Sequence, residues 1–162
     1  MERRRLRGWL VIASGAALVA TSGHAAAQEA EADCFDALVY ASIARQTPTL
    51  QPGCGDDCIV MRWAWIVELD VERAIKGKAG SGRLTVLTSQ HSYYRSDLGM
   101  RRWWLRRNEL GGFNVLSFAE KVRYRRCPEG TPPAVPFVRP GDGRTLRDLQ
   151  REGEKHYGKE PD

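Results

Sequence analysis

WAWIVELDVERAIKGKAGSGRLTVLTS, residues 63–89, is the stretch of sequence from which the fold can be predicted. Apolar and acidic side chains alternate along its first half, with Trp65, Val67, Leu69 and Val71 on one face and Glu68, Asp70 and Glu72 on the other. Such period-two alternation is typical of a strand with one buried face. The glycine-rich run KGKAGSG then interrupts the pattern, and alternation resumes at Leu84. The stretch therefore predicts two antiparallel strands joined by a turn.

Further strands are predicted on both sides of this pair. Apolar or alternating runs place them at Ala37–Ala44, Phe113–Ala119 and Lys121–Cys127, while Arg101–Arg107 fits either a strand or a loop. The strand that contains the opening stretch is predicted over residues 59–75. Because it would be long for a flat sheet, we expect it to contain a bend or a bulge.

The remaining segments complete a mainly β pattern. Prolines and glycines predict a loop over residues 47–57 and exclude regular structure over residues 128–143. A short helix is predicted to open over residues 145–150, with Thr145 as its N-cap. Since no alternating βα units occur, the elements indicate a small β-barrel or sandwich.

Residues 1–27 have the composition of a secretory signal peptide. A basic start, MERRRLR, precedes a short apolar run and then the small residues Ala25–Ala27. The run is shorter than the about 20 residues of a spanning helix, so we expect no retained membrane span and a periplasmic or secreted protein. Cleavage removes four arginines and one glutamate, so the formal charge falls from +5 to +2. A charge this low gives little support to a nucleic-acid partner, and we do not expect one.

All four cysteines follow the predicted cleavage site. An even number in an exported chain is typical of disulfides, and four cysteines allow three pairings. We favour Cys34 with Cys127, which would join the two ends of the β region, and Cys54 with Cys58, which would close a tight loop. Cys54 and Cys58 are separated by three residues rather than the two of redox and zinc pairs. We therefore expect neither a metal site nor a cofactor.

The order of these motifs resembles the netrin-like, or tissue-inhibitor-of-metalloproteinases-like, domains of bacterial secreted proteins. The similarity rests on a strand end V-x-R-x-x-K-G at Val71–Gly77, a short strand at Leu84–Val86, a glycine-aromatic strand start at Gly112–Leu116, the late Cys127 and the terminal helix. The resemblance implies a mainly β fold, a small five-stranded OB-like barrel with a C-terminal helix packed on it. The barrel domain would span residues 28–127, and residues 128–162 would form a Pro-rich linker, a short helix and a tail.

The resemblance also implies an alternative function, inhibition of a metalloprotease. Inhibitors of that superfamily chelate the target zinc through the amine and carbonyl of a mature N-terminal cysteine. Here Cys34 lies six residues after Gln28, the expected mature N-terminus. Inhibition by that mechanism would therefore require a second cleavage.

The most distinctive cluster of candidate binding residues is the run RRWWLRR, residues 101–107, with Arg123, Arg125 and Arg126 further along the chain. Arginines interleaved with aromatic side chains are suited to stacking on sugars or bases and to pairing with carboxylate or phosphate groups. The ligand-binding candidates are Arg101, Arg102, Trp103, Trp104, Arg106 and Arg107. The structural alternative is that a tryptophan of the run lies in the core and that the arginines balance the acidic strand face.

Two other clusters have simpler explanations than chemistry. The acidic face of the opening stretch could hold Ca²⁺, but cross-strand pairing with arginine is favoured. His91 lies near Ser89 and Asp97, yet no nucleophile-elbow motif positions them, so a hydrolase is disfavoured and we expect no enzyme. The sequence predicts a secreted or periplasmic, non-catalytic binding or interaction module. Its partner would be an unidentified protein or, alternatively, an anionic glycan.

Overall fold

The computed structural model describes residues 34–53, 60–91, 93–94, 96–141 and 143–158 of the chain. The predicted signal peptide, residues 1–27, and the predicted disulfide between Cys54 and Cys58 therefore lie outside the described residues.

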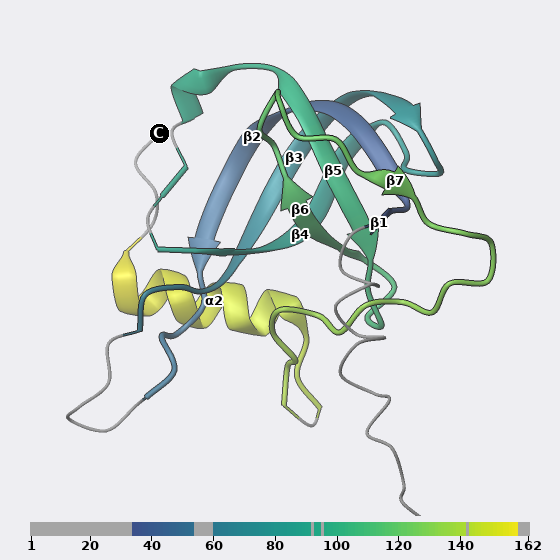
Figure 1. The fold of residues 1–162 in the computed structure, drawn as a ribbon. Helices are drawn as coiled ribbons and strands as arrows, with labels where there is room; N and C mark the ends of the chain where they lie inside the picture. The colour runs from purple at the N-terminus through teal and green to yellow at the C-terminus, as the bar shows by residue number, and fades with distance from the viewer. Residues whose placement is uncertain (1–33, 54–59, 92, 95, 142, 159–162) are drawn as a thin grey trace, which may run out of the picture.

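Five strands close into a barrel in the order β2-β3-β4-β6-β5, in which β5 pairs with both β2 and β6. Figure 1 shows α2 outside the barrel. The elements are β1 (Cys34–Phe35), β2 (Ala37–Pro48), β3 (Trp63–Lys76), β4 (Gly82–Gln90), the 3-10 turn η1 (Ser96–Leu98), β5 (Arg101–Arg107), β6 (Phe113–Ser117), β7 (Arg125–Arg126) and α2 (Leu146–Tyr157). The predicted fold class, a mainly β, five-stranded OB-like barrel with a C-terminal helix packed on it, is confirmed.

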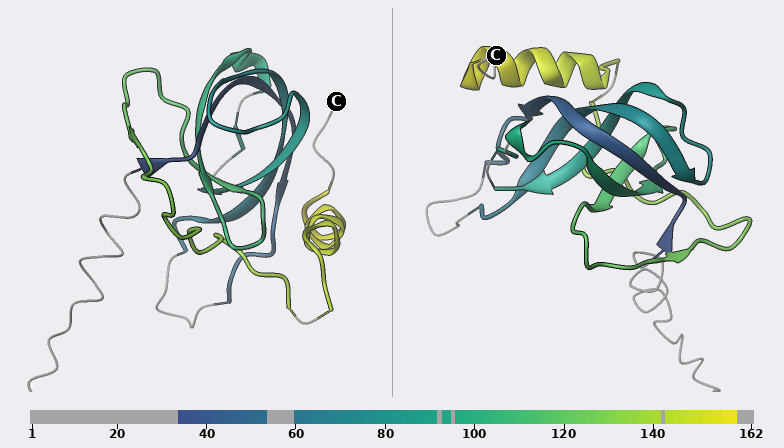
Figure 2. Two further views of the ribbon diagram at one scale, coloured as in Figure 1. Left: turned by 90° about the vertical axis from the view of Figure 1, so that its right-hand side faces the viewer. Right: turned by 90° about the horizontal axis from the view of Figure 1, so that it is seen from above.

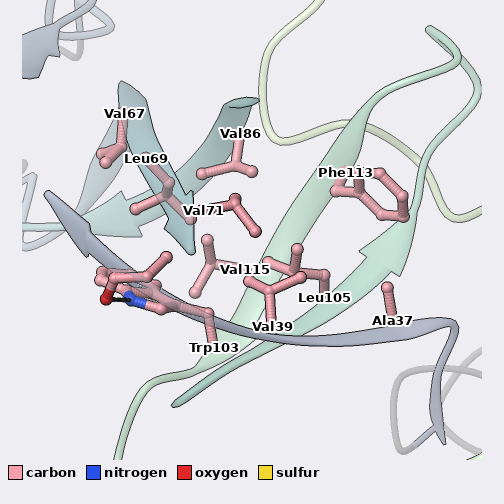
Figure 3. Close-up of a cluster of buried hydrophobic side chains, with 11 residues drawn as sticks. Ala37, Val39, Val67, Leu69, Val71, Val86, Trp103, Leu105, Phe113 and Val115 are labelled. Atoms are coloured by element: carbon pink, nitrogen blue, oxygen red, sulfur yellow. Dashed lines mark hydrogen bonds between the residues drawn. The ribbon is translucent and has the colours of Figure 1, made fainter. Parts of the chain in front are cut away.

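Alternating residues of β3 fill the inside of the barrel with apolar side chains. Val67, Leu69 and Val71 belong to one buried cluster that Val115 of β6 and Trp103 of β5 also join (Figure 3). The only polar atom of the Trp103 side chain, Nε1, donates a hydrogen bond of 3.0 Å to the carbonyl of Ala41. Burial of each large apolar side chain contributes about 1.5–3 kcal/mol, so this interior cluster is the main source of barrel stability.

The predicted β3–β4 hairpin is confirmed, since the two strands pair antiparallel from Trp63 opposite Gln90 to Val71 opposite Gly82. The expected irregularity is also present, because three register shifts interrupt the pairing of β2 with β3. The prediction that a loop begins at Thr47 is wrong by two residues. Thr47 and Pro48 still pair with β3, because that strand is long enough to offer them partners.

Barrel closure explains why the strand predicted over Lys121–Cys127 is mostly absent. Both edges of β5 are already paired, so the barrel leaves no edge at which this segment could add a strand. Within the segment, Arg125 and Arg126 form β7 by pairing in parallel with β1. The alternating Tyr124 packs instead on Trp104 of β5, with ring centres 5.7 Å apart.

A disulfide fixes this outer segment to the N-terminal end of the barrel. Cys34 of β1 is bonded to Cys127, which directly follows β7, as predicted. The backbone N–H of Cys127 also donates to the carbonyl of Phe35 at 2.9 Å. Covalent and hydrogen bonds together therefore hold β1 and β7 side by side on the outside of β5.

The helix α2 begins as the sequence predicts. The side chain of Thr145 accepts from the N–H of Asp148, and the Asp148 carboxylate accepts from the N–H of Thr145, which forms a capping box. The hydroxyl of Thr145 also donates to this carboxylate, and this bond, the Thr145 N–H and Arg151 together lower the pKa of Asp148 to about 2. The helix then continues to Tyr157, beyond the predicted residues. Among the described residues, no helix has the length and apolar character needed to cross a membrane.

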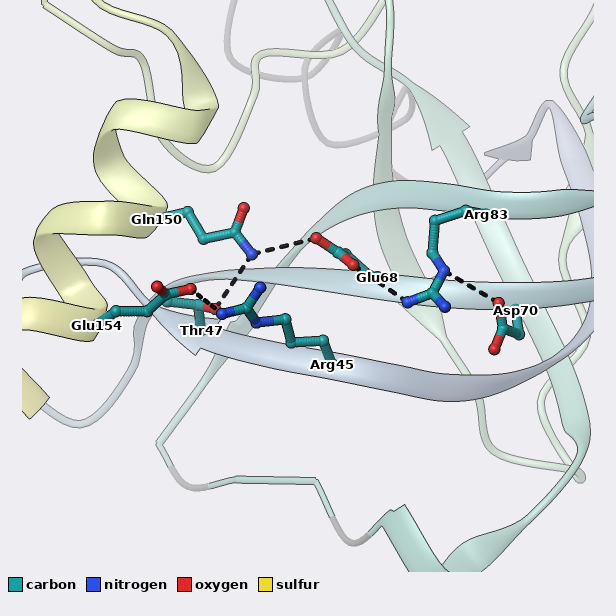
Figure 4. A network of polar contacts seen from close by, with 7 residues as sticks. All are labelled: Arg45, Thr47, Glu68, Asp70, Arg83, Gln150 and Glu154. Atoms are coloured by element: carbon teal, nitrogen blue, oxygen red, sulfur yellow. Dashed lines mark hydrogen bonds and ion pairs between the residues drawn. The ribbon is translucent and has the colours of Figure 1, made fainter. Parts of the chain in front are cut away.

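Helix α2 lies along the outside of the barrel (Figure 2) and is attached by apolar and polar contacts. Leu149 is buried against Ile66 of β3 and Leu87 of β4. Figure 4 shows the polar contacts: Arg45 pairs with Glu154, and Gln150 donates to Glu68 at 3.2 Å and to Thr47 at 3.4 Å. Both kinds of contact place the helix over β2, β3 and β4.

We predict that Gly153→Ala detaches or shifts α2. A Cβ at Gly153 would lie 1.9 Å from the carbonyl oxygen of Pro48. Alanine raises helix propensity by about 1 kcal/mol, but an overlap with backbone atoms puts the cost of overpacking near the upper end of about 1–3 kcal/mol, so we expect a net loss of about 2 kcal/mol in the free energy of unfolding. Urea unfolding measures this loss in the free energy of unfolding. Gly80→Ala is the control, because nothing lies within 4 Å of that position. An unchanged or raised stability of Gly153→Ala would contradict the close approach.

We also predict that the double variant Cys34→Ala, Cys127→Ala is markedly less stable. The bond joins residues 93 positions apart, and loss of so long a closed loop costs about 2–5 kcal/mol. Chemical unfolding under non-reducing conditions measures the difference. A double variant as stable as the native protein would show that β1 and β7 stay paired without the bond.

Candidate functional site

The six predicted ligand-binding residues lie on or at the ends of β5, but the strand separates them. Trp103 points into the barrel and is fully buried, while Trp104 points outward and is only 6% exposed. Alternate residues of a strand face opposite sides, so adjacent tryptophans cannot share a surface. Neither indole is available for stacking on a ligand, and the structural alternative for the tryptophans applies to both.

Trp104 is buried because the N-terminal strand and the segment before β7 lie over it. It packs with Phe35 and Leu38, and the ring centres of Phe35 and Trp104 are 4.8 Å apart. Tyr124 contacts it from the segment that leads to β7 and donates to the carbonyl of Leu116 at 3.4 Å. This outer cluster is the apolar base of the surface on which the basic residues lie.

Arg106 has a structural position as well. It is 1% exposed, and its guanidinium pairs with the carboxylate of Asp36 and donates to the carbonyl of Pro132. A buried charge requires such partners, because leaving it unpaired costs several kcal/mol. Arg106 therefore joins β5 to the start of β2 and to the chain after β7.

Asp36 organises the end of the barrel near the disulfide. Its Oδ2 accepts from the backbone N–H of Arg107 at 2.6 Å as well as from Arg106, and its own N–H donates to the carbonyl of Leu105 at 2.8 Å. Its carbonyl oxygen faces Gly77, where a Cβ would lie only 2.0 Å away. Gly77 also has φ +78°, so both the close approach and the backbone conformation require glycine at this position. This close approach brings the turn after β3 next to β1.

The candidate site, here named the disulfide-end cleft, opens around Asp36. Its volume is about 520 Å³. Its lining is Asp36, Lys78, Arg107, Arg126, Cys127, Pro128, Glu129, Gly130 and Thr131. The three cations come from different parts of the chain, the β3–β4 turn, the end of β5 and β7, and all are exposed. Within the described chain, none of their side chains makes a hydrogen bond or an ion pair.

The charge of the cleft is positive because Asp36 is already neutralised. Its carboxylate is bound by Arg106, so Glu129 is the lining carboxylate left to oppose three cations. Thr131 is engaged too, since its hydroxyl donates to the carbonyl of Pro128 at 2.7 Å. Three cations around one concave surface attract an anionic group more strongly than isolated surface charges do.

A second concave surface, the Tyr40 hollow, lies at the other end of β5. Its volume is about 390 Å³, and it is lined by Tyr40, Met100, Arg101, Arg102, Glu120 and Arg123. The guanidinium of Arg101 lies 5.4 Å from the ring centre of Phe118 and donates to the carbonyl of Leu98 at 2.9 Å. Arg102 is exposed and makes no hydrogen bond or ion pair within the described residues.

The acidic face of β3 pairs with arginine as expected. Arg83 of β4 contacts Glu68 at 3.2 Å and Asp70 at 3.0 Å, so the partner comes from the hairpin itself and not from β5 (Figure 4). Glu72 lies 3.5 Å from Arg73. In the described part of the chain, no group of three potential metal ligands lies together.

The sequence indicated Arg102 and Arg107 as binding residues, with Arg126 among the arginines further along the chain, but it did not indicate Lys78, which lies in the glycine-rich turn. The basic residues that flank Gly77 were the available signal for Lys78. No sequence pattern marked Asp36 as a site residue, because its partner Arg106 is 70 residues away in the sequence.

Comparison with known proteins found no match for this chain among protein-family models, curated proteins or solved structures. The resemblance to netrin-like domains therefore stays a prediction.

We predict that Arg106→Ala destabilises the protein far more than Arg102→Ala. Removing one partner of a buried pair costs about 3–5 kcal/mol, and because the Asp36 side chain is 24% exposed we expect about 2–4 kcal/mol. Arg102 is exposed, so its replacement should change the free energy of unfolding by less than about 0.5 kcal/mol. Urea unfolding of both variants measures this. Equal effects would show that Arg106 has no special structural role.

Proposed function

We propose that this protein is a secreted or periplasmic, non-catalytic binding module that holds an anionic group of its partner in the disulfide-end cleft. The observation that carries the proposal is the convergence of Lys78, Arg107 and Arg126 on one concave surface. A barrel, a disulfide and a buried ion pair fix the elements that bear these residues. Little ordering of the backbone would therefore be needed on binding, which favours affinity.

The polar groups of the cleft support binding rather than chemistry. Oδ2 of Asp36 accepts from Arg106 and from a backbone N–H, and the Thr131 hydroxyl donates to a carbonyl. The side chains that remain for a ligand are chiefly cations. Arginine and lysine in this arrangement bind carboxylate, sulfate or phosphate groups.

The proposal is tested by calorimetric titration with a heparin-derived tetrasaccharide at low and at physiological salt. We expect the double variant Arg107→Ala, Arg126→Ala to weaken binding by about tenfold, since charge-assisted hydrogen bonds contribute about 1.5–3 kcal/mol each and part of this is lost to solvent screening. Higher salt should weaken binding by the native protein, because exposed charges are screened.

The matched control is Arg147→Ala, Lys155→Ala. It removes the same charge from exposed positions of α2 that make no hydrogen bond or ion pair within the described residues. We expect its affinity at physiological salt to stay within about twofold of the native value, because neither residue lines the cleft or the Tyr40 hollow and exposed charges are screened. Equal weakening by both double variants would show attraction by net charge alone, and an absence of binding by the native protein would contradict the proposal.

A further inference from the structure

Tyr40 of β2 lies between two arginines on the outer surface of the barrel. It is opposite Arg73 of β3 on one side and opposite Arg102 of β5 on the other. The Arg73 guanidinium lies 5.1 Å from the centre of the Tyr40 ring. An aromatic ring with a guanidinium on each neighbouring strand offers an apolar surface for a sugar ring and charges for its acidic substituents.

The wall of the Tyr40 hollow also holds a donor without an acceptor. Nε of Arg101 is buried and has no hydrogen-bond partner among the residues that the structure describes. Buried donors are normally satisfied by protein, water or ligand. Arg123, which lines the same hollow, has its guanidinium bonded to the carbonyls of Glu120 and Val122 and is thereby held at the rim.

The hollow and the disulfide-end cleft are joined by two stretches of chain. Arg102 and Arg107 are five residues apart on β5, which corresponds to roughly 17 Å at about 3.3 Å per residue. Arg123 and Arg126 are three residues apart on the segment that packs over β5 through Tyr124. Each stretch thus has one arginine in the hollow and one in the cleft.

We propose that the ligand is an extended acidic polysaccharide that occupies the disulfide-end cleft and the Tyr40 hollow together. This inference rests on the proposed function and adds to it the length and the repeating charge of the ligand. A single anionic group would fill one of the two surfaces. A chain that repeats its negative charge can bind both, and the second contact then forms at a high effective concentration.

The positions of the aromatic side chains favour a polysaccharide over single-stranded nucleic acid. Nonspecific binding of single strands relies on exposed aromatic rings on which successive bases stack. The two tryptophans of β5 are buried, so Tyr40 is the single aromatic side chain among the residues that line the two surfaces. Charge pairing, supplemented by one aromatic ring, suits a ligand that carries its charges on sugar rings.

The test measures affinity against ligand length, with heparin-derived di- and decasaccharides as probes and the full exported chain as the protein. We expect Arg102→Ala, Arg123→Ala to weaken binding of the decasaccharide by about tenfold and to leave disaccharide binding within about twofold. Arg107→Ala, Arg126→Ala should weaken both. Urea unfolding confirms that each variant is folded.

The outcomes separate this inference from the proposed function. If Arg102→Ala, Arg123→Ala binds the decasaccharide as the native protein does, the extended ligand is ruled out while the cleft stays. If Arg107→Ala, Arg126→Ala changes neither affinity, the proposed function fails. A single-stranded oligodeoxynucleotide of equal charge that binds as tightly as the decasaccharide would overturn the assignment to a polysaccharide.

Discussion

The bond network of Asp36 is the constraint on which the disulfide end of the molecule depends. Its carboxylate holds Arg106 and the backbone of Arg107, its N–H holds Leu105, and its carbonyl oxygen lies against Gly77. One residue thereby joins the start of β2, the end of β5 and the turn after β3. Lys78 and Arg107 lie around this point, and the disulfide between Cys34 and Cys127 adds β7 with Arg126, so the cleft forms where these elements meet.

The same network explains why Arg106 is buried in a protein of this size. A buried ion pair contributes little net stability, because desolvation of both charges offsets their attraction. The role of Arg106 is to position neighbouring segments. It neutralises Asp36, and its bond to the carbonyl of Pro132 fixes the chain after β7 against the barrel. The lining of the cleft is then positive without a competing internal carboxylate at its centre.

Local patterns predicted the elements, and long-range contacts decided the site. The alternation of β3, the turn around Gly77 and the cap at Thr145 are local, and the structure has all three. The composition of the run RRWWLRR indicated binding, but whether its side chains can reach a ligand depends on which segments pack on each side of β5. Trp104 is covered by Phe35 and Tyr124, residues far away in the sequence. No periodicity within the run contains that information, and the same is true of the pair formed by Asp36 and Arg106.

The helix α2 also determines which face of the barrel stays exposed. OB-type barrels commonly bind ligands on the face of their second and third strands, which here are β3 and β4. Leu149 of α2 is buried against Ile66 and Leu87 of those strands, and Gly153 allows the helix to contact Pro48 directly. Since α2 occupies this face, the exposed basic surface lies instead along β5, between the disulfide-end cleft and the Tyr40 hollow. Attachment of the helix and exposure of the basic surface along β5 are therefore two results of the same packing.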